Sequence, residues 1–267
     1  MRIEIDGKEV AARPGQTILE AARANGIRIP TLCHNPALEP AAMCRLCTVE
    51  ISEGHRARLV TACNYPLRRD AKIHTQTDNI RMGRKLIIEL LYARCPTSTV
   101  LKGLAEEYGA DLNRFPADDV ECVMCGLCAR VCERVGGNCL TLSGRGVEIK
   151  VDTAFGRPSE SCIACGACAQ ICPVDAIRIE DSEGVRRVII HGKVASAIPL
   201  RHCTSCGKHF GPVIDLNKVM EMAGEPAVPP PNASVCPECS RRNLAKRLME
   251  RHSEQYDLDR LETGEEA

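Results

Sequence analysis

The sequence has no tryptophan and only three phenylalanines and four tyrosines among its 267 residues. This shortage of aromatic volume excludes one large aromatic core. We therefore expect small domains, stabilised by something besides apolar burial. An excess of charge is also absent, because 35 basic residues balance 35 acidic ones. The chain as a whole is therefore not drawn towards nucleic acid or an anionic membrane.

Long apolar runs are missing, which argues against a membrane span. The first residues, MRIEIDGKEV, alternate apolar and charged side chains. A signal peptide would instead have a basic start and a continuous apolar stretch, so we expect a cytoplasmic protein. The sequence also lacks a glycine-rich dinucleotide motif, a Walker loop and a nucleophile–base pattern. We expect no catalytic residues in this chain.

Cysteine, by contrast, occurs eighteen times. An even number would suit a secreted disulfide framework, but the spacing favours metal. The phrases CVMCGLCARVC, from Cys122, and CIACGACAQICP, from Cys162, both follow C-x2-C-x2-C-x3-C. This spacing converges four sulfurs on a small volume, whereas disulfides gain little from closing such short loops.

The second phrase fits the bacterial ferredoxin run, including Pro173, while the first has Glu133 where proline is expected. In two-cluster ferredoxins the fourth cysteine of each run binds the other cluster. We therefore predict two [4Fe-4S] clusters with crossed ligands. One is held by Cys122, Cys125, Cys128 and Cys172, and the other by Cys162, Cys165, Cys168 and Cys132. Cys139 lies between the runs, fits neither spacing and receives no role.

The first 76 residues follow another pattern. Asp6-Gly7 between two short segments predicts a hairpin, and a helix should run from its cap at Thr17 to Gly26. A cysteine loop and returning strands follow, which together indicate a β-grasp ferredoxin domain. One [2Fe-2S] cluster is predicted on Cys33, Cys44, Cys47 and Cys63. The first gap is longer than in plant-type ferredoxins, and a metal-free cysteine loop is the alternative.

Two stretches resemble a known family. CHNPALEPAAMCRLCTVEI resembles the [2Fe-2S] loop of the large iron-sulfur subunit of respiratory complex I. It also resembles the same loop in related subunits, found in diaphorase units of NAD-linked hydrogenases and in iron-iron hydrogenases. The region from Cys122 through SGRG to Ile177 resembles the dicluster module that follows in this family. The resemblance covers about residues 1–180, and it implies electron exchange with an NADH-oxidising subunit that contains flavin and iron-sulfur centres.

One cluster of that family has no counterpart here. Its ligands are one histidine and three cysteines, but residues 77–116 contain only Cys95 and no histidine. We predict two amphipathic helices in this linker and a structural role for Cys95. Their predicted apolar faces consist of Leu86, Ile87, Leu90 and Leu91 in the first helix, then Val100, Leu101 and Leu104 in the second.

The last seventy residues carry two C-x2-C knuckles. Four thiolates in this pattern predict structural zinc, with a third [4Fe-4S] cluster as the alternative. The predicted ligands are Cys203, Cys206, Cys236 and Cys239. A proline-rich loop separates the knuckles. A basic helix with Leu244 and Leu248 on one packed face should follow them, and then a disordered acidic tail.

The expected fold class is α+β, with four parts. Residues 1–76 form the β-grasp [2Fe-2S] domain, 77–116 the helical linker, 117–194 the 2[4Fe-4S] ferredoxin module, and 195–267 a zinc-ribbon-like knuckle region with a C-terminal helix. Three redox centres without a reactive site predict a subunit that relays electrons for other subunits. The resemblance implies that it belongs to a multisubunit NAD(P)H-linked oxidoreductase, whose terminal partner would be a hydrogenase, a formate dehydrogenase or a heterodisulfide-reductase-like unit.

Two other classes of function remain open. A redox-sensing regulator would use its clusters to report oxidation, but it should show a nucleic-acid recognition helix or basic patch, and none is found. A stand-alone ferredoxin-like carrier is usually small and acidic, and this chain is neither. Co-purification discriminates the three, because a relay elutes with flavoprotein subunits, a regulator with DNA and a carrier alone.

Overall fold

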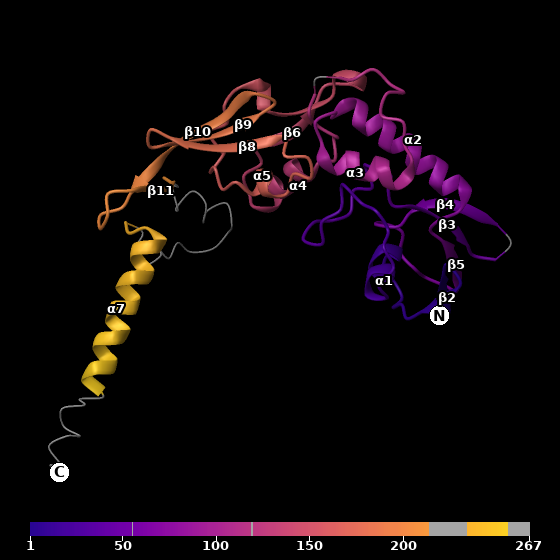
Figure 1. Ribbon diagram of the computed structural model, residues 1–267, viewed down its shortest axis with the longest axis horizontal. Helices are drawn as coiled ribbons and strands as arrows, with labels where there is room; N and C mark the ends of the chain where they lie inside the picture. The colour runs from indigo at the N-terminus through magenta and orange to yellow at the C-terminus, as the bar shows by residue number, and fades with distance from the viewer. Residues whose placement is uncertain (55, 119, 214–233, 256–267) are drawn as a thin grey trace, which may run out of the picture. The chain divides into compact units, whose positions relative to one another are not determined.

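The computed structural model describes residues 1–54, 56–118, 120–213 and 234–255 (Figure 1). The proline-rich loop and the acidic tail fall largely outside these ranges. The chain divides into two compact units, Met1–Glu180 with Arg187–Ser196, and Asp181–Arg186 with Ala197–Ala267. Within the described residues, none of the helices combines the length and apolar composition that crossing a membrane requires.

The N-terminal domain contains a mixed five-stranded sheet in the order β2-β1-β5-β3-β4. Strand β1 runs parallel to β5, and the other pairs are antiparallel. The predicted hairpin is confirmed, because Asp6 and Gly7 both have positive φ, at 50° and 81°, as a tight two-residue turn requires. The strands are β1 (Ile3–Ile5), β2 (Lys8–Val10), β3 (Thr48–Ser52), β4 (Ala57–Thr61) and β5 (Ala71–His74).

Helix α1 (Ile18–Ala24) begins at a capping box. The backbone N–H of Glu20 donates to Thr17 Oγ1 at 3.2 Å, and the backbone N–H of Thr17 donates to Glu20 Oε2 at 2.8 Å. One face of the helix is fully buried in the sheet's apolar core. Because Cys47 and Cys63 belong to the same core, packing of α1 on the sheet fixes the backbone around two predicted cluster ligands.

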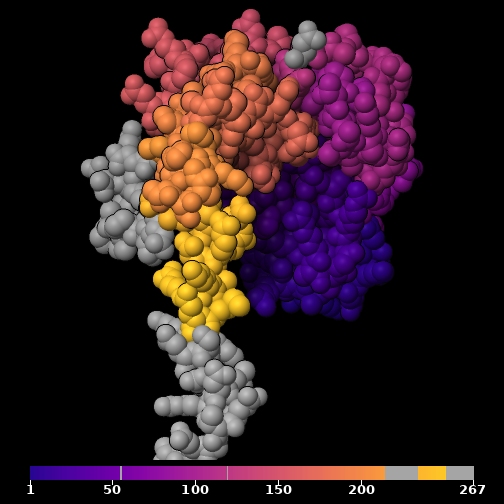
Figure 2. Space-filling view, turned by 60° about the vertical axis from the view of Figure 1, so that its left-hand side comes forward, coloured from indigo at the N-terminus to yellow at the C-terminus, as the bar shows by residue number. Residues whose placement is uncertain are grey.

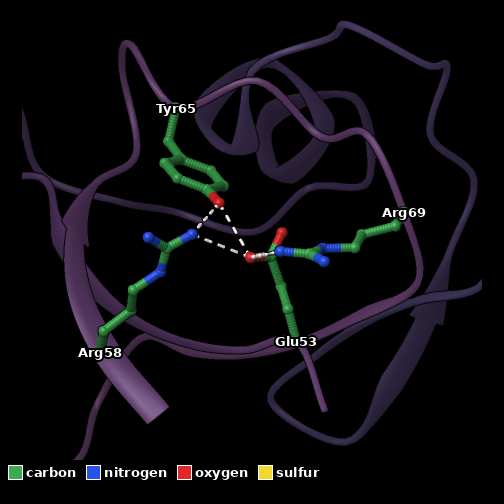
Figure 3. Close-up of polar contacts among 4 residues, drawn as sticks. All are labelled: Glu53, Arg58, Tyr65 and Arg69. Carbon is green, nitrogen blue, oxygen red and sulfur yellow. Dashed lines mark hydrogen bonds and ion pairs between the residues drawn. The ribbon is translucent and has the colours of Figure 1, made fainter. Parts of the chain in front are cut away.

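A polar cluster centred on Glu53 closes the end of the β3–β4 hairpin (Figure 3). Its carboxylate oxygen Oε2 accepts hydrogen bonds from Arg58 at 2.9 Å, Tyr65 at 3.0 Å and Arg69 at 3.1 Å. The Glu53 side chain is only 7% exposed, although both arginines are more than half exposed. Hydrogen bonds from Arg69, and then from Tyr65 and Arg58, outweigh burial and lower the pKa of Glu53.

We expect Glu53→Gln to destabilise the protein by roughly 1 kcal/mol at neutral pH, since it removes a partly screened ion pair. The lowered pKa means that this stabilisation is present above the unfolded-state value, roughly pH 4.3, and is lost as pH falls through the folded-state value. The difference between wild type and variant in urea unfolding should therefore shrink on acidification. Glu9→Gln, an exposed change on β2, is the control, and a pH-independent difference would contradict the assignment.

Two linker helices follow, as predicted: α2 (Asp78–Arg94) and α3 (Thr99–Tyr108). The predicted apolar face of α2 is partly wrong, however, because Leu86 and Leu90 are 40% and 48% exposed. The buried stripe is instead Ile80, Arg84 and Ile88, at i, i+4 spacing. In α3, Val100 is likewise exposed, while Leu101 and Leu104 are buried as expected. Figure 2 shows these helices, in magenta, lying directly on the indigo N-terminal domain.

Arg84 explains the altered face of α2. Its side chain is 1% exposed, and its guanidinium donates to the carbonyl oxygens of Leu46 at 3.0 Å and Thr48 at 2.9 Å. The same group lies 5.7 Å from the ring centroid of Tyr108 on α3. Arg84 therefore connects both linker helices to the backbone on either side of Cys47.

We expect Arg84→Met to destabilise the N-terminal domain by about 2–4 kcal/mol, because it strands two buried carbonyl groups without a donor. Methionine keeps most of the buried apolar volume, so the cost isolates the lost polar contacts. The measurement is urea unfolding followed by circular dichroism. Arg81→Met, one turn away on the exposed face of α2, should have almost no effect, and equal costs for the two variants would argue against this account.

The rest of the first unit is built on two short helices, α4 (Leu127–Arg134) and α5 (Ala167–Gln170). Each is preceded by a left-handed glycine, Gly126 or Gly166, directly after the second cysteine of its run. Strands β6 (Leu140–Ser143) and β7 (Lys150–Thr153) pair antiparallel after α4. Two single turns, Gly146–Glu148 and Ala154–Gly156, lie on either side of β7.

A four-stranded sheet, in the order β11-β10-β9-β8, contributes residues to both units. Its strands are β8 (Ile177–Ser182), β9 (Val185–Ile190), β10 (Lys193–His202) and β11 (His209–Pro212). Helix α7 (Pro237–Gln255) follows the second knuckle. Its predicted packed face is wrong for the described part of the chain, since Leu244 and Leu248 are 52% and 57% exposed. The helix is therefore anchored only at its knuckle end among the described residues.

Candidate metal centres

The four cysteines predicted for the [2Fe-2S] site lie together. Cys33 and Cys44 come from the loop after α1, Cys47 directly precedes β3, and Cys63 lies two residues after the end of β4. The thiols of Cys33 and Cys44 lie within electrostatic reach of each other, as do those of Cys47 and Cys63. The backbone N–H of Cys44 also donates to Cys33 Sγ at 3.3 Å. All four thiols are buried, so the donor set and its enclosure fit a [2Fe-2S] cluster.

The two four-cysteine runs adopt the same local geometry. In the first, Met124 has φ 53° and its backbone N–H donates to Cys122 Sγ at 3.4 Å. In the second, Ala164 has φ 47° and donates to Cys162 Sγ, also at 3.4 Å. The turn therefore points a backbone amide at a sulfur atom in both runs, which is how ferredoxins stabilise negative charge on a cluster.

A cavity lies beside the first run and is lined by Cys122, Cys125, Cys128 and Cys172. The rest of its wall is mostly apolar. Burial, followed by the influence of neighbouring thiolates that include Cys172, raises the pKa of Cys125 to about 12. His191 also lines the cavity, and neither of its buried ring nitrogens has a hydrogen-bond partner among the described residues. Four thiols and an unsatisfied donor around one apolar cavity fit a [4Fe-4S] cluster.

The second run forms a more open group. Cys165 is exposed and Cys162 and Cys168 are half-buried, whereas all four cysteines of the first run are buried. Burial raises the pKa of Cys168 to about 12, and the charges of Cys165, Cys162 and Cys132 act in the same direction. Cys132 therefore lies within electrostatic reach of the second run, as Cys172 does of the first.

Cys139, which sequence reasoning left without a role, belongs to this second group. Its Sγ lies 3.1 Å from Cys132 Sγ, and its thiol is within electrostatic reach of that of Cys162. The spacing of Cys139 matches neither run, so only the fold reveals its position. The preceding glycines, Gly136 and Gly137, were the available sequence signal, because they permit the chain to turn back on the helix.

The [2Fe-2S] loop and the first run share one buried apolar cluster. Cys33, Cys44 and Cys125 all belong to it, together with linker residues such as Ile88 and Leu101. Arg130, on α4, donates to the carbonyl oxygens of Cys33 and Glu39, both at 2.6 Å. These two cysteine groups are therefore neighbours in the fold, although the linker between them in sequence has no cluster ligands of its own.

Cys95 is fully buried at the end of α2, where its backbone N–H donates to the carbonyl oxygens of Leu91 and Tyr92. Desolvation is the main cause that raises the pKa of this thiol. Its burial among linker side chains is compatible with the predicted structural role.

The four C-terminal cysteines form the fourth group. The sulfur atoms of Cys203, Cys206, Cys236 and Cys239 all lie within 4.8 Å of one another. Cys206 Sγ and Cys236 Sγ are 3.8 Å apart. Tetrahedral zinc with bonds of about 2.3 Å places its sulfurs roughly 3.8 Å apart, so the group is compact enough for a single ion. The backbone N–H of Cys236 donates to Cys203 Sγ at 3.3 Å and the guanidinium of Arg242 donates to Cys239 Sγ at 3.0 Å.

Comparison with known proteins identifies two of these modules. Residues 1–78 match the 2Fe-2S iron-sulfur cluster binding domain, and residues 159–178 match the 4Fe-4S binding domain. The chain therefore contains a 2Fe-2S ferredoxin domain and a 4Fe-4S ferredoxin motif, as the sequence predicted. The first four-cysteine run lies outside both matched ranges.

Two similar proteins are subunits of oxidoreductases that are named for NADPH or NADH. NADPH-Fe(3+) oxidoreductase subunit alpha of Geobacter sulfurreducens is 33% identical over 182 residues, covering 58% of this chain and 21% of the relative. The NADH-ubiquinone oxidoreductase 75 kDa subunit of Reclinomonas americana is 28% identical over 179 residues, covering 57% of this chain and 26% of the relative. The chain thus spans about a fifth to a quarter of the length of these relatives. Their similarity confirms the resemblance to the complex I iron-sulfur subunit.

A solved structure agrees with this relationship. A chain of an NAD+-reducing [NiFe]-hydrogenase in the H2-reduced state superposes with a TM-score of 0.57 and 27% identity. The alignment covers 65% of this chain and 85% of the hydrogenase chain.

Proposed function

We propose that this protein is an electron-transfer subunit of a multisubunit NAD(P)H-linked oxidoreductase. It would relay electrons between a flavin- and iron-sulfur-containing subunit and a terminal catalytic subunit. The observation that carries the proposal is the shared buried cluster of Cys33, Cys44 and Cys125, which makes the [2Fe-2S] site a direct neighbour of the first [4Fe-4S] site. Electron tunnelling weakens steeply with distance, so such adjacency suits a relay that lacks the family's middle cluster.

The proposed ligand sets are the crossed ones. Cys172 supports the first set, since it lines the cavity with Cys122, Cys125 and Cys128, and Cys132 supports the second through its interaction with Cys168. When bound, each cluster supplies one-electron chemistry at its iron and sulfide atoms. The protein's own residues bind the iron through thiolates, donate backbone hydrogen bonds to the sulfurs and exclude water from the first site.

At the C-terminal group we propose a structural zinc ion bound by Cys203, Cys206, Cys236 and Cys239. Support comes from the 3.8 Å separation of the Cys206 and Cys236 sulfurs, which equals the expected edge of a tetrahedral thiolate site. This ion would fix the start of α7 relative to the first knuckle and take no part in electron transfer.

We further propose that the second [4Fe-4S] site exchanges electrons with a partner subunit. Cys165 is exposed and its neighbours are half-buried, so a docked partner can approach this centre closely. The terminal partner would be a hydrogenase, a formate dehydrogenase or a heterodisulfide-reductase-like unit. A cytoplasmic location is supported by the cysteine spacing, which suits metal–thiolate sites rather than disulfides, as is usual in a reducing compartment.

The test is anaerobic purification of the tagged chain from its native cells, followed by addition of NADH or NADPH. We expect a flavoprotein to co-purify and the visible absorption of the clusters to bleach on addition of the nucleotide. Removing the flavoprotein at high salt should abolish the bleaching, and returning it should restore it. A chain that elutes with DNA, or alone without any loss of reducibility, would favour the regulator or the free carrier instead.

A further inference from the structure

The second [4Fe-4S] site contains one thiol more than a cluster needs. Besides the proposed ligands Cys162, Cys165, Cys168 and Cys132, it contains Cys139, whose Sγ is 3.1 Å from Cys132 Sγ. Cys139 also lies within electrostatic reach of Cys162, so it is near ligands from both runs. By contrast, the cavity of the first site is lined by four cysteines only.

The position of Cys139 is fixed by the turn that follows α4. The backbone N–H groups of Gly137 and Asn138 both donate to the carbonyl oxygen of Cys132, at 2.9 and 3.3 Å. The next backbone N–H, that of Cys139, donates to Cys132 Sγ at 3.4 Å. Three successive backbone N–H groups therefore donate to Cys132, and this turn places the Cys139 thiol next to the Cys132 thiol.

Glycine at position 137 leaves room for this approach. A Cβ atom there would meet Cys132 Sγ at 3.0 Å, so a side chain would require this sulfur to shift by a few tenths of an ångström. Asn138 adopts a positive φ of 45°, which keeps the turn tight. Cys139 is 7% exposed, and its thiol is therefore shielded inside the site rather than free at the surface.

From this geometry we propose that Cys139 is an alternative ligand of the second [4Fe-4S] cluster and can replace Cys132 on the same iron atom. The inference rests on the proposed cluster at this site. In the exchange, the Fe–S bond to Cys132 breaks, the Fe–S bond to Cys139 forms, and a proton moves from the Cys139 thiol to the Cys132 thiolate. No electron is gained or lost, so the step needs no oxidant or reductant.

The exchange concerns Cys132 rather than the other ligands. Cys162, Cys165 and Cys168 come from one C-x2-C-x2-C run, in which the backbone N–H of Ala164 donates to Cys162 Sγ at 3.4 Å. Cys132 enters from α4, and the loop that carries Cys139 starts directly after this helix. Cys132 and Cys139 are therefore both placed to act as the fourth ligand of the second cluster.

The test is the iron and acid-labile sulfide content of the full chain, reconstituted anaerobically with ferrous iron and sulfide. Wild type should contain about ten irons. Cys132→Ala and Cys139→Ala should each retain about ten, whereas the double variant should lose about four. The matched control is Cys172→Ala, the equivalent change in the first site, which has no spare thiol and should lose about four irons alone.

The iron contents of the variants test the alternative-ligand proposal, and the iron content of wild type tests the proposed relay. Loss of about four irons from Cys132→Ala alone would overturn the alternative-ligand proposal, as would retention of all iron by the double variant. Low-temperature electron paramagnetic resonance of the reduced protein provides a second readout, since a cluster bound through Cys139 should give shifted g-values in Cys132→Ala. Absence of the second cluster from wild type would instead refute the proposed relay, so the two failures are distinguishable.

Discussion

Replacing Cys172 with alanine is expected to remove about four of roughly ten iron atoms, and those atoms should come from the cluster bound by the first run. Cys172 stands at the end of the second run, but it lines the cavity formed by Cys122, Cys125 and Cys128. Loss of one thiolate leaves an iron atom without a protein ligand inside a buried apolar cavity, where no other thiol lies in the wall. The expected effect is loss of the whole cluster rather than a change in its properties.

Double variants determine which cluster is lost. If the ligands cross, Cys172→Ala combined with Cys165→Ala should remove about eight irons, because the two cysteines serve different clusters. Combined with Cys125→Ala, it should remove only about four. The reverse pattern would show that each run binds its own cluster. Cys95→Ala is the control, since this cysteine is not a proposed ligand and does not line the cavity, so its loss should leave the iron content unchanged.

The second large effect is expected at the knuckles. Cys236→Ala should release about one zinc ion per chain while the iron content and the visible absorption stay unchanged. Structural zinc supplies most of the folding energy of small thiolate sites, so the start of α7 should lose its anchor. Trypsin should then cleave faster after Arg241 and Arg242, which lie in the first turns of this helix.

Ser240→Ala, in the same helical turn, provides the control because its side chain is not a predicted ligand and zinc should remain bound. Elemental analysis and a timed digest check both variants. Bleaching of the visible spectrum and loss of about four irons in Cys236→Ala would instead identify the group as a third [4Fe-4S] site. The relay would then extend into the second unit.

Features that depend on local spacing could be predicted from the sequence. The capping box of Thr17 and Glu20, the turn at Asp6-Gly7 and the cysteine-to-glycine order of the two runs each act within a few residues. The residues that determine each of these features are therefore close together in the sequence. For the same reason, the four thiol groups could be proposed from C-x2-C spacing before any fold was considered.

Features that depend on distant contacts could not be predicted in this way. An arginine in an amphipathic helix is expected at the surface. Arg84 is nevertheless buried, because the carbonyl oxygens of Leu46 and Thr48 accept hydrogen bonds from its guanidinium group. Burial of that stripe turns Leu86 and Leu90 outward. Cys139 is a similar case, since its role depends on a turn that brings it back to Cys132.

The unequal burial of the two proposed [4Fe-4S] sites also has a consequence when the protein meets oxygen. Cys122, Cys125 and Cys128 are buried and line a largely apolar cavity, whereas Cys165 is exposed and its neighbours are half-buried. Dissolved oxygen reaches open thiolate–iron bonds more readily than buried ones. Oxidative damage should therefore begin at the second cluster and move inward, and the centre best placed to meet a partner is the one that cells would have to rebuild most often.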